Sequence, residues 1–120
     1  MKLSIEQKEM LKLFMDEYCP YENIAEWSFI GDLFLQAREM NSICFQRRFS
    51  KYPGLIDLFN QMLNDNSVLL ESFEKLKKRK AKLFKAIETG VDNKRLHRFW
   101  RGSVTDFSKK FCAFQKRLCQ

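Results

Sequence analysis

The sequence predicts an all-α fold: a compact bundle of about six antiparallel or orthogonal helices that forms one domain over residues 1–120. Apolar residues recur every three or four positions along most of the chain, and no stretch alternates with period two for long enough to require a strand. Gly and Pro together occupy only six positions. A chain of 120 residues can bury one hydrophobic core but is too short for two ordinary domains.

The first predicted helix covers residues 5–18. Ser4 and Gln7 match a capping box, in which two side chains satisfy backbone N–H groups at a helix start. The apolar residues that follow share one face: Met10, Leu11, Phe14, Met15 and Tyr18. Pro20 cannot continue a helix interior, so this helix ends near Tyr18.

Three shorter helical segments follow. The first is predicted from about Glu22 to Met40, with Gly31 or residues 41–42 as candidate interruptions. An apolar face over residues 43–49 predicts the second, which ends at the Pro- and Gly-containing turn of residues 50–54. Residues 55–63 carry six apolar side chains at helical spacing and predict the third, which ends at residues 64–66.

Two long helices are predicted in the second half of the chain. The first begins at Ser67, breaks its four-three apolar rhythm at Lys80 and ends at Gly90; its apolar residues are Leu69, Phe73, Leu76, Leu83 and Ile87. Asp92 is placed to cap the second, which has a candidate bend at Gly102 and the apolar residues Leu96, Trp100, Val104, Phe107, Phe111, Phe114 and Leu118. Because each face covers only about three heptads, we interpret both as core-facing rather than as an intermolecular coiled coil.

Basic residues are concentrated in the second half. Residues 1–66 contain 7 basic and 10 acidic residues, whereas residues 67–120 contain 15 basic and 5 acidic. Such a surface attracts an anionic partner: nucleic acid, an acidic lipid headgroup or an acidic protein. The uncharged apolar runs are only a few residues long, and the N-terminal stretch does not read as a signal peptide. We therefore expect a cytoplasmic protein, with peripheral association at the inner membrane surface as an alternative.

The sequence contains no pattern typical of an enzyme or of a metal site. His97 is the single histidine and lies in a basic stretch. The four cysteines show no C-x-x-C pairing, so a zinc site is not expected: Cys19, Cys44, Cys112 and Cys119. A Gly-rich phosphate loop is also missing. We therefore expect a binding protein with no cofactor.

Two groups of basic residues are candidates for contacts with an anion or with nucleic acid. They are Lys77, Lys78 and Arg79 in the first long helix, and Arg95 and Arg101 in the second. Arg98 continues the three-residue spacing of the second group, and Trp100 lies beside it, which suits phosphate contacts combined with base stacking. The alternative is a solvated basic face with Trp100 in the core.

Two blocks of residues are similar to landmarks of a known family. Phe14, the segment Glu22-Asn23-Ile24 and Trp27 have the separations of the Phe-Leu, Glu-Asn-Leu/Ile and Phe-Trp landmarks of regulator of G-protein signalling (RGS) domains. Arg98-Phe99-Trp100-Arg101, followed by Ser103, resembles the Arg-Phe-Leu-Lys/Arg-Ser segment that opens the last helix of that family. The chain thus resembles an RGS domain over residues 11–107.

The resemblance implies an RGS-like bundle that engages the switch regions of a Gα subunit and accelerates its GTP hydrolysis by stabilising the partner's own catalytic arrangement. It implies partner contacts by Glu22, Asn23 and Arg98, and we assign Lys94, four residues before Arg98, to the same surface. It also implies that the first and last helices pack together, with residues 14–27 close to residues 98–107. The competing hypothesis is a basic helical module that binds nucleic acid or serves as an adaptor for another acidic protein.

Overall fold

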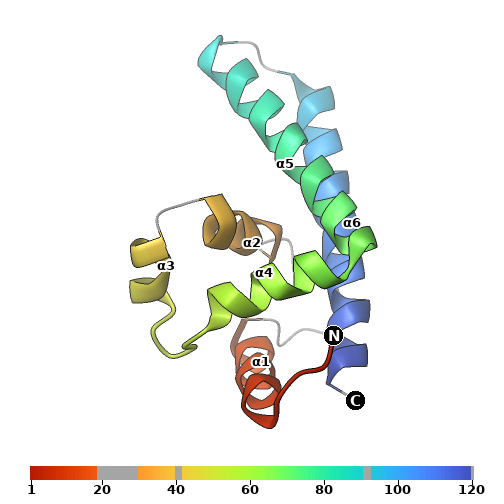
Figure 1. Cartoon of the computed structure of the whole chain (residues 1–120). Coiled ribbons are helices and arrows are strands. Elements are labelled where there is room, and N and C mark those ends of the chain that lie inside the picture. The colour runs from red at the N-terminus through yellow and green to blue at the C-terminus, as the bar shows by residue number, and fades with distance from the viewer. Residues whose placement is uncertain (19–29, 40–41, 91–92, 120) are drawn as a thin grey trace.

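The computed structural model describes residues 1–18, 30–39, 42–90 and 93–119. Across them the chain forms six α-helices and no strand, which confirms the predicted all-α class. The helices are α1 (Ile5–Tyr18), α2 (Ile30–Glu39), α3 (Ser42–Arg48), α4 (Leu55–Asp65), α5 (Ser67–Glu88) and α6 (Lys94–Leu118) (Figure 1). None of these six is both long enough and apolar enough to cross a lipid bilayer.

Local hydrogen bonds set the start of α1 and the end of α5. The N–H of Gln7 donates to Ser4 Oγ at 3.1 Å, and the N–H of Ser4 donates to Gln7 Oε1 at 3.0 Å, which confirms the predicted capping box. After α5, Thr89 is the cap residue, and Gly90 follows with a φ of 74°. This left-handed conformation is one that glycine adopts without strain, so the predicted end of the helix is confirmed.

The cap of α6 is Asn93. Its Oδ1 accepts hydrogen bonds from the N–H groups of Arg95 and Leu96 at 3.1 and 3.3 Å. The predicted cap, Asp92, lies outside the described residues, and Asn93 supplies the same kind of side-chain oxygen to the first turn. The helix then continues through Gly102 as a single element.

The arrangement is a long antiparallel hairpin with the shorter helices gathered around one end. Figure 1 shows α5 beside α6, with the joined end of the hairpin extending beyond α1 to α4 and both chain termini at the opposite end. Among the shorter helices, α2 packs against α3, α4, α5 and α6, and α4 packs against α1 and α5. The molecule is accordingly elongated, with dimensions of 48 × 29 × 26 Å.

The core is built around stacked and edge-on phenylalanine rings. Phe34 of α2 lies in the middle: its ring centroid is 4.1 Å from that of Phe59, 4.9 Å from that of Phe107 and 5.3 Å from that of Phe111. Phe14 joins the group through Phe59, at 5.6 Å. The apolar residues of α5 and α6 that lie close to these phenylalanine rings are buried in the same core, as predicted.

One predicted core position is wrong. Ile87 follows the apolar rhythm of α5, but it is 54% exposed. It lies in the last turn of α5, in the part of the hairpin that extends beyond α1 to α4 (Figure 1). The periodicity therefore continues past the point at which the core ends.

Candidate nucleic-acid interface

The projecting end of the hairpin contains half of the basic residues of the chain. We call residues 75–101 the basic arm. In the sequence they include eleven Lys and Arg and two Asp and Glu, a net charge of +9, whereas the rest of the chain has a net charge of −2. The described residues of the arm are 75–90 and 93–101. The charge asymmetry between the halves of the sequence is thus concentrated at one end of the molecule (Figure 1).

The sequence-predicted contact residues are distributed as follows. All five candidates for anion contacts lie on the basic arm: Lys78, Arg95 and Arg101 are exposed, and Lys77 and Arg79 are half-buried. Lys94 and Arg98, two of the four candidates for partner contacts, are also exposed on the arm, in the first turns of α6. The other two, Glu22 and Asn23, lie outside the described residues.

The structure brings two of these arginines together around an aromatic ring. The Cζ atoms of Arg79 and Arg95 lie 5.2 and 5.3 Å from the ring centroid of Phe99. Arg79 donates hydrogen bonds to the carbonyl oxygen of Phe99 at 3.0 Å and to Ser103 Oγ at 2.7 Å, so its guanidinium is held in place. Phe99 is still 40% exposed. A ring that faces solvent is thus combined with donors suited to phosphate.

Trp100 has a different setting from Phe99. It is half-buried and packs against the core, which is the alternative considered for it from the sequence. Lys80, the break in the apolar rhythm of α5, places its Nζ 5.5 Å from the Trp100 ring and 5.4 Å from the Phe84 ring. Phe84 is 53% exposed. The aromatic rings open to solvent on the arm are therefore Phe84 and Phe99, neither of which was a candidate for stacking in the sequence.

A polar group at the base of the arm fixes α5 against α6. Ser72 Oγ and Lys110 Nζ donate to the same oxygen of Asp106, at 2.8 and 2.9 Å. Burial acts to raise the pKa of the Asp106 carboxyl, but the hydrogen bonds from Lys110 and Ser72 outweigh it and hold the pKa below its ordinary value. The ionised carboxylate therefore joins α6 to α5 through Ser72 and is paired with Lys110 within α6.

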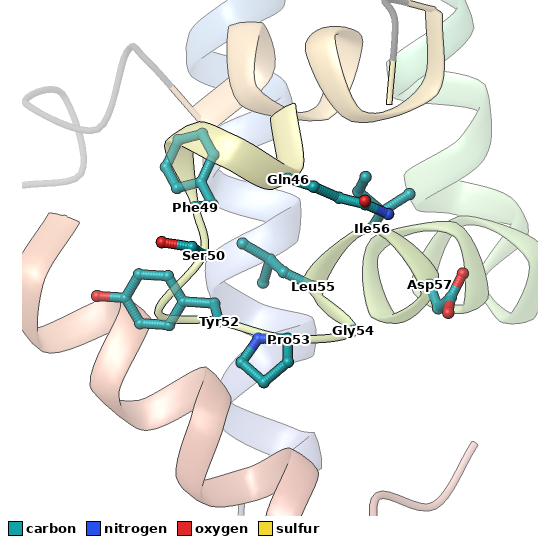
Figure 2. A pocket seen from close by; sticks show the side chains of 9 residues that line it. All are labelled: Gln46, Phe49, Ser50, Tyr52, Pro53, Gly54, Leu55, Ile56 and Asp57. Carbon is teal, nitrogen blue, oxygen red and sulfur yellow. The ribbon is translucent and has the colours of Figure 1, made fainter. Parts of the chain in front are cut away.

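A separate hollow of about 520 Å³ lies at the turn between α3 and α4 (Figure 2). Figure 2 shows the Tyr52 hydroxyl directed toward α1, where it donates a hydrogen bond to Glu17. Burial, together with this bond, raises the pKa of the Tyr52 hydroxyl, so it acts as a fixed structural donor. The lining residues include one carboxylate, Asp57, and neither a histidine nor a cysteine. We assign no reaction to this hollow, because its lining offers no nucleophile with an adjacent base.

The position of α1 bears on the RGS resemblance. Met15 of α1 and Cys119, which follows α6, line the same hollow, so the first helix lies beside the carboxyl end of the last one. Arg98 is near the other end of α6, about 30 Å along the helix axis from Cys119 at 1.5 Å per residue. Residues 19–29 lie outside the described part of the chain, so their expected approach to Arg98 stays a prediction.

The fold and the site define a class: a helical protein whose aromatic core supports a projecting cationic hairpin. The chain matches no protein-family model, no curated protein and no solved structure. In the described part of the chain, no group of three or more His, Cys, Asp or Glu residues could hold a metal ion. The function is therefore inferred from the chemistry of the basic arm.

Proposed function

We propose that this protein binds nucleic acid through the basic arm, by contacts with phosphate groups. The proposal rests on one observation: eleven Lys and Arg residues lie on a hairpin that extends from the rest of the molecule. Each phosphate that a cation neutralises releases condensed counterions, and this release drives binding that is independent of base sequence. A projecting arm also allows contact without obstruction by α1 to α4.

Two of these basic residues lie where a positive charge lowers the stability of the helix but strengthens the attraction of phosphate. Lys94 and Arg95 lie in the first turn of α6, which contains no acidic residue. The amino end of a helix carries a positive partial charge, so a cation there opposes helix stability by about 0.3–1 kcal/mol. The same placement adds to the positive potential that attracts phosphate.

The test measures binding of a fluorescein-labelled oligothymidylate by fluorescence anisotropy over a series of salt concentrations. We expect the logarithm of the association constant to fall linearly with the logarithm of the salt concentration. Lys78, Lys82 and Lys85 are exposed along one side of α5. Their replacement by Gln should lower the magnitude of the slope by up to about 2, because each lost contact with a single strand accounts for about 0.7.

A matched control removes the same charge from the other end of the molecule. Lys2, Lys12 and Lys116 are exposed and lie outside the basic arm, so their replacement by Gln should leave the slope unchanged. Equal losses in the two triple variants would show that the arm is not the binding surface. No binding by the parent at low salt of either the oligothymidylate or a DNA duplex of the same length would refute the proposal outright.

Engagement of a Gα subunit is the second proposal. It is favoured by the joint exposure of Lys94 and Arg98, two of its four candidate contacts, on one end of α6. Its test is GTP hydrolysis by Gα in the presence of the parent or of Asn23→Ala, with circular dichroism to verify that the variant is folded. No acceleration by the parent, or equal acceleration by Asn23→Ala, would reject this site and leave the nucleic-acid proposal unaffected.

A further inference from the structure

One row of exposed residues on α6 combines a ring, guanidinium groups and open space. Arg95, Arg98, Phe99 and Gly102 occupy positions i, i+3, i+4 and i+7, which lie along one side of a helix, and all four are exposed. Arg79 reaches this row from α5 through its contacts with Phe99. We call these five residues the Phe99 row.

We propose that the Phe99 row binds single-stranded nucleic acid, with a base stacked on Phe99 and the neighbouring phosphates on Arg79, Arg95 and Arg98. This inference rests on the proposed function and narrows it from nucleic acid in general to single strands. Paired bases in a duplex are stacked on their neighbours, whereas each base of a single strand can offer a face to an aromatic side chain.

The geometry of the row suits this ligand. Arg79 is anchored by two hydrogen bonds and lies over the Phe99 ring, as Arg95 does, so a base that stacks on the exposed part of the ring has two cations within reach. Arginine can pair with phosphate through two parallel N–H donors, which fixes the strand as well as attracting it. A Cβ built at Gly102 meets no atom within 4 Å, so space is open one turn from Phe99 for a base that extends past the edge of the ring.

Phe84 provides the contrast on the same arm. It is exposed to a similar degree, but its cationic neighbour is Lys80, whose ammonium also lies over Trp100. An ammonium is a compact point charge and lacks the two-pronged geometry of a guanidinium. Phe84 is therefore a matched control: an exposed phenylalanine within the arm and outside the Phe99 row.

An anionic membrane would also attract the arm, and the end of the arm combines exposed apolar side chains with polar and acidic groups. Phe84 and Ile87 are 53% and 54% exposed, and Glu88, Thr89 and Gly90, which follow them, are exposed as well. The carboxylate of Glu88 would be repelled by acidic headgroups. The exposed Phe99 ring beside the hydrogen-bonded Arg79 favours nucleic acid over lipid, because a lipid headgroup offers a phosphate but no base to stack.

The experiment compares oligothymidylate of about 20 nucleotides, a length that covers the usual single-strand sites, with a duplex of the same length at one salt concentration. Phe99→Leu keeps an apolar side chain but removes the π face, so it should weaken binding of the single strand about fivefold or more. Phe84→Leu should leave the affinity unchanged. Gly102→Leu fills the open space and should weaken binding of the single strand without loss of helicity.

The outcomes separate this inference from the proposed function. The single-strand inference would be overturned if the parent bound strand and duplex with equal affinity. It would also be overturned if Phe99→Leu and Phe84→Leu changed the affinity equally. Neither result would affect the proposal that the arm binds nucleic acid in a salt-dependent way. If Phe99→Leu bound the single strand with the affinity of the parent, the single-strand inference would also be overturned. Binding to phosphatidylserine vesicles with no binding to either nucleic acid would overturn both proposals. Urea unfolding verifies that each variant is folded.

Discussion

Alanine substitutions at Gly31 and Gly102 should change the free energy of unfolding in opposite directions. At Gly102 an added Cβ meets no atom within 4 Å, and the residue lies inside α6. Alanine there reduces the backbone freedom of the unfolded chain without strain in the folded one. We expect Gly102→Ala to raise the free energy of unfolding by about 0.5–1 kcal/mol.

At Gly31 the same methyl group would lie 2.7 Å from Cδ1 of Leu76. This is about 1 Å closer than the optimal separation of two carbon atoms. Leu76 has no exposed surface, so it can move only by displacing other core side chains. Overpacking of this kind costs about 1–3 kcal/mol, more than alanine gains in helix propensity. We expect Gly31→Ala to lower the free energy of unfolding by about 1 kcal/mol.

Urea unfolding followed by circular dichroism measures both variants against the parent. The expected separation of about 2 kcal/mol is readily resolved when the midpoints are compared at a common slope. If Gly31→Ala were as stable as the parent, the close approach of α2 to α5 would not limit packing, and the predicted overpacking of Leu76 would be refuted. A loss of stability in Gly102→Ala would mean that the space beside Phe99 is not open.

Two further predictions concern the core and the base of the arm. Phe34→Ala should lower the free energy of unfolding by about 3–5 kcal/mol in urea, because the ring is almost fully buried between Phe59 and Phe107; a loss below about 1 kcal/mol would contradict this packing. Asp106→Asn should cost about 1 kcal/mol at pH 7, through the lost charged hydrogen bond with Lys110. Because the folded pKa of Asp106 is lowered, its stabilising effect is present above the ordinary carboxyl pKa and is lost as the pH falls through the folded pKa. The stabilities of parent and variant should therefore begin to converge only below about pH 4, the ordinary carboxyl pKa. A difference that stays constant with pH would contradict the role of the charge.

Local signals in the sequence were sufficient for much of the fold. The capping box at Ser4 and the apolar spacing after it predict α1 with its observed bounds, because both signals act within a few residues. Gly90 marks the end of α5 for the same reason. The exposure of Ile87 could not be predicted, since periodicity shows which residues share a face and not whether another helix covers that face.

The candidate site was predicted in its charge and not in its geometry. The basic residues of the arm are visible in the sequence, but Arg79 and Phe99 are 20 positions apart and meet only through the register of α5 on α6. That register depends on distant contacts such as the one between Ser72 and Asp106. The roles of Asn23 and its neighbour Glu22 stay predictions, because both lie outside the described residues.

The separation of charge between the basic arm and the remainder makes the molecule a permanent electric dipole. One end of a body 48 Å long has a net charge of +9, and the rest has a net charge of −2. The electric field of a nearby polyanion exerts a torque on this dipole, so the arm is turned toward the polyanion before the two molecules are in contact. This alignment acts over about 8 Å at physiological ionic strength, so added salt should slow the encounter by randomising orientation as well as by weakening attraction.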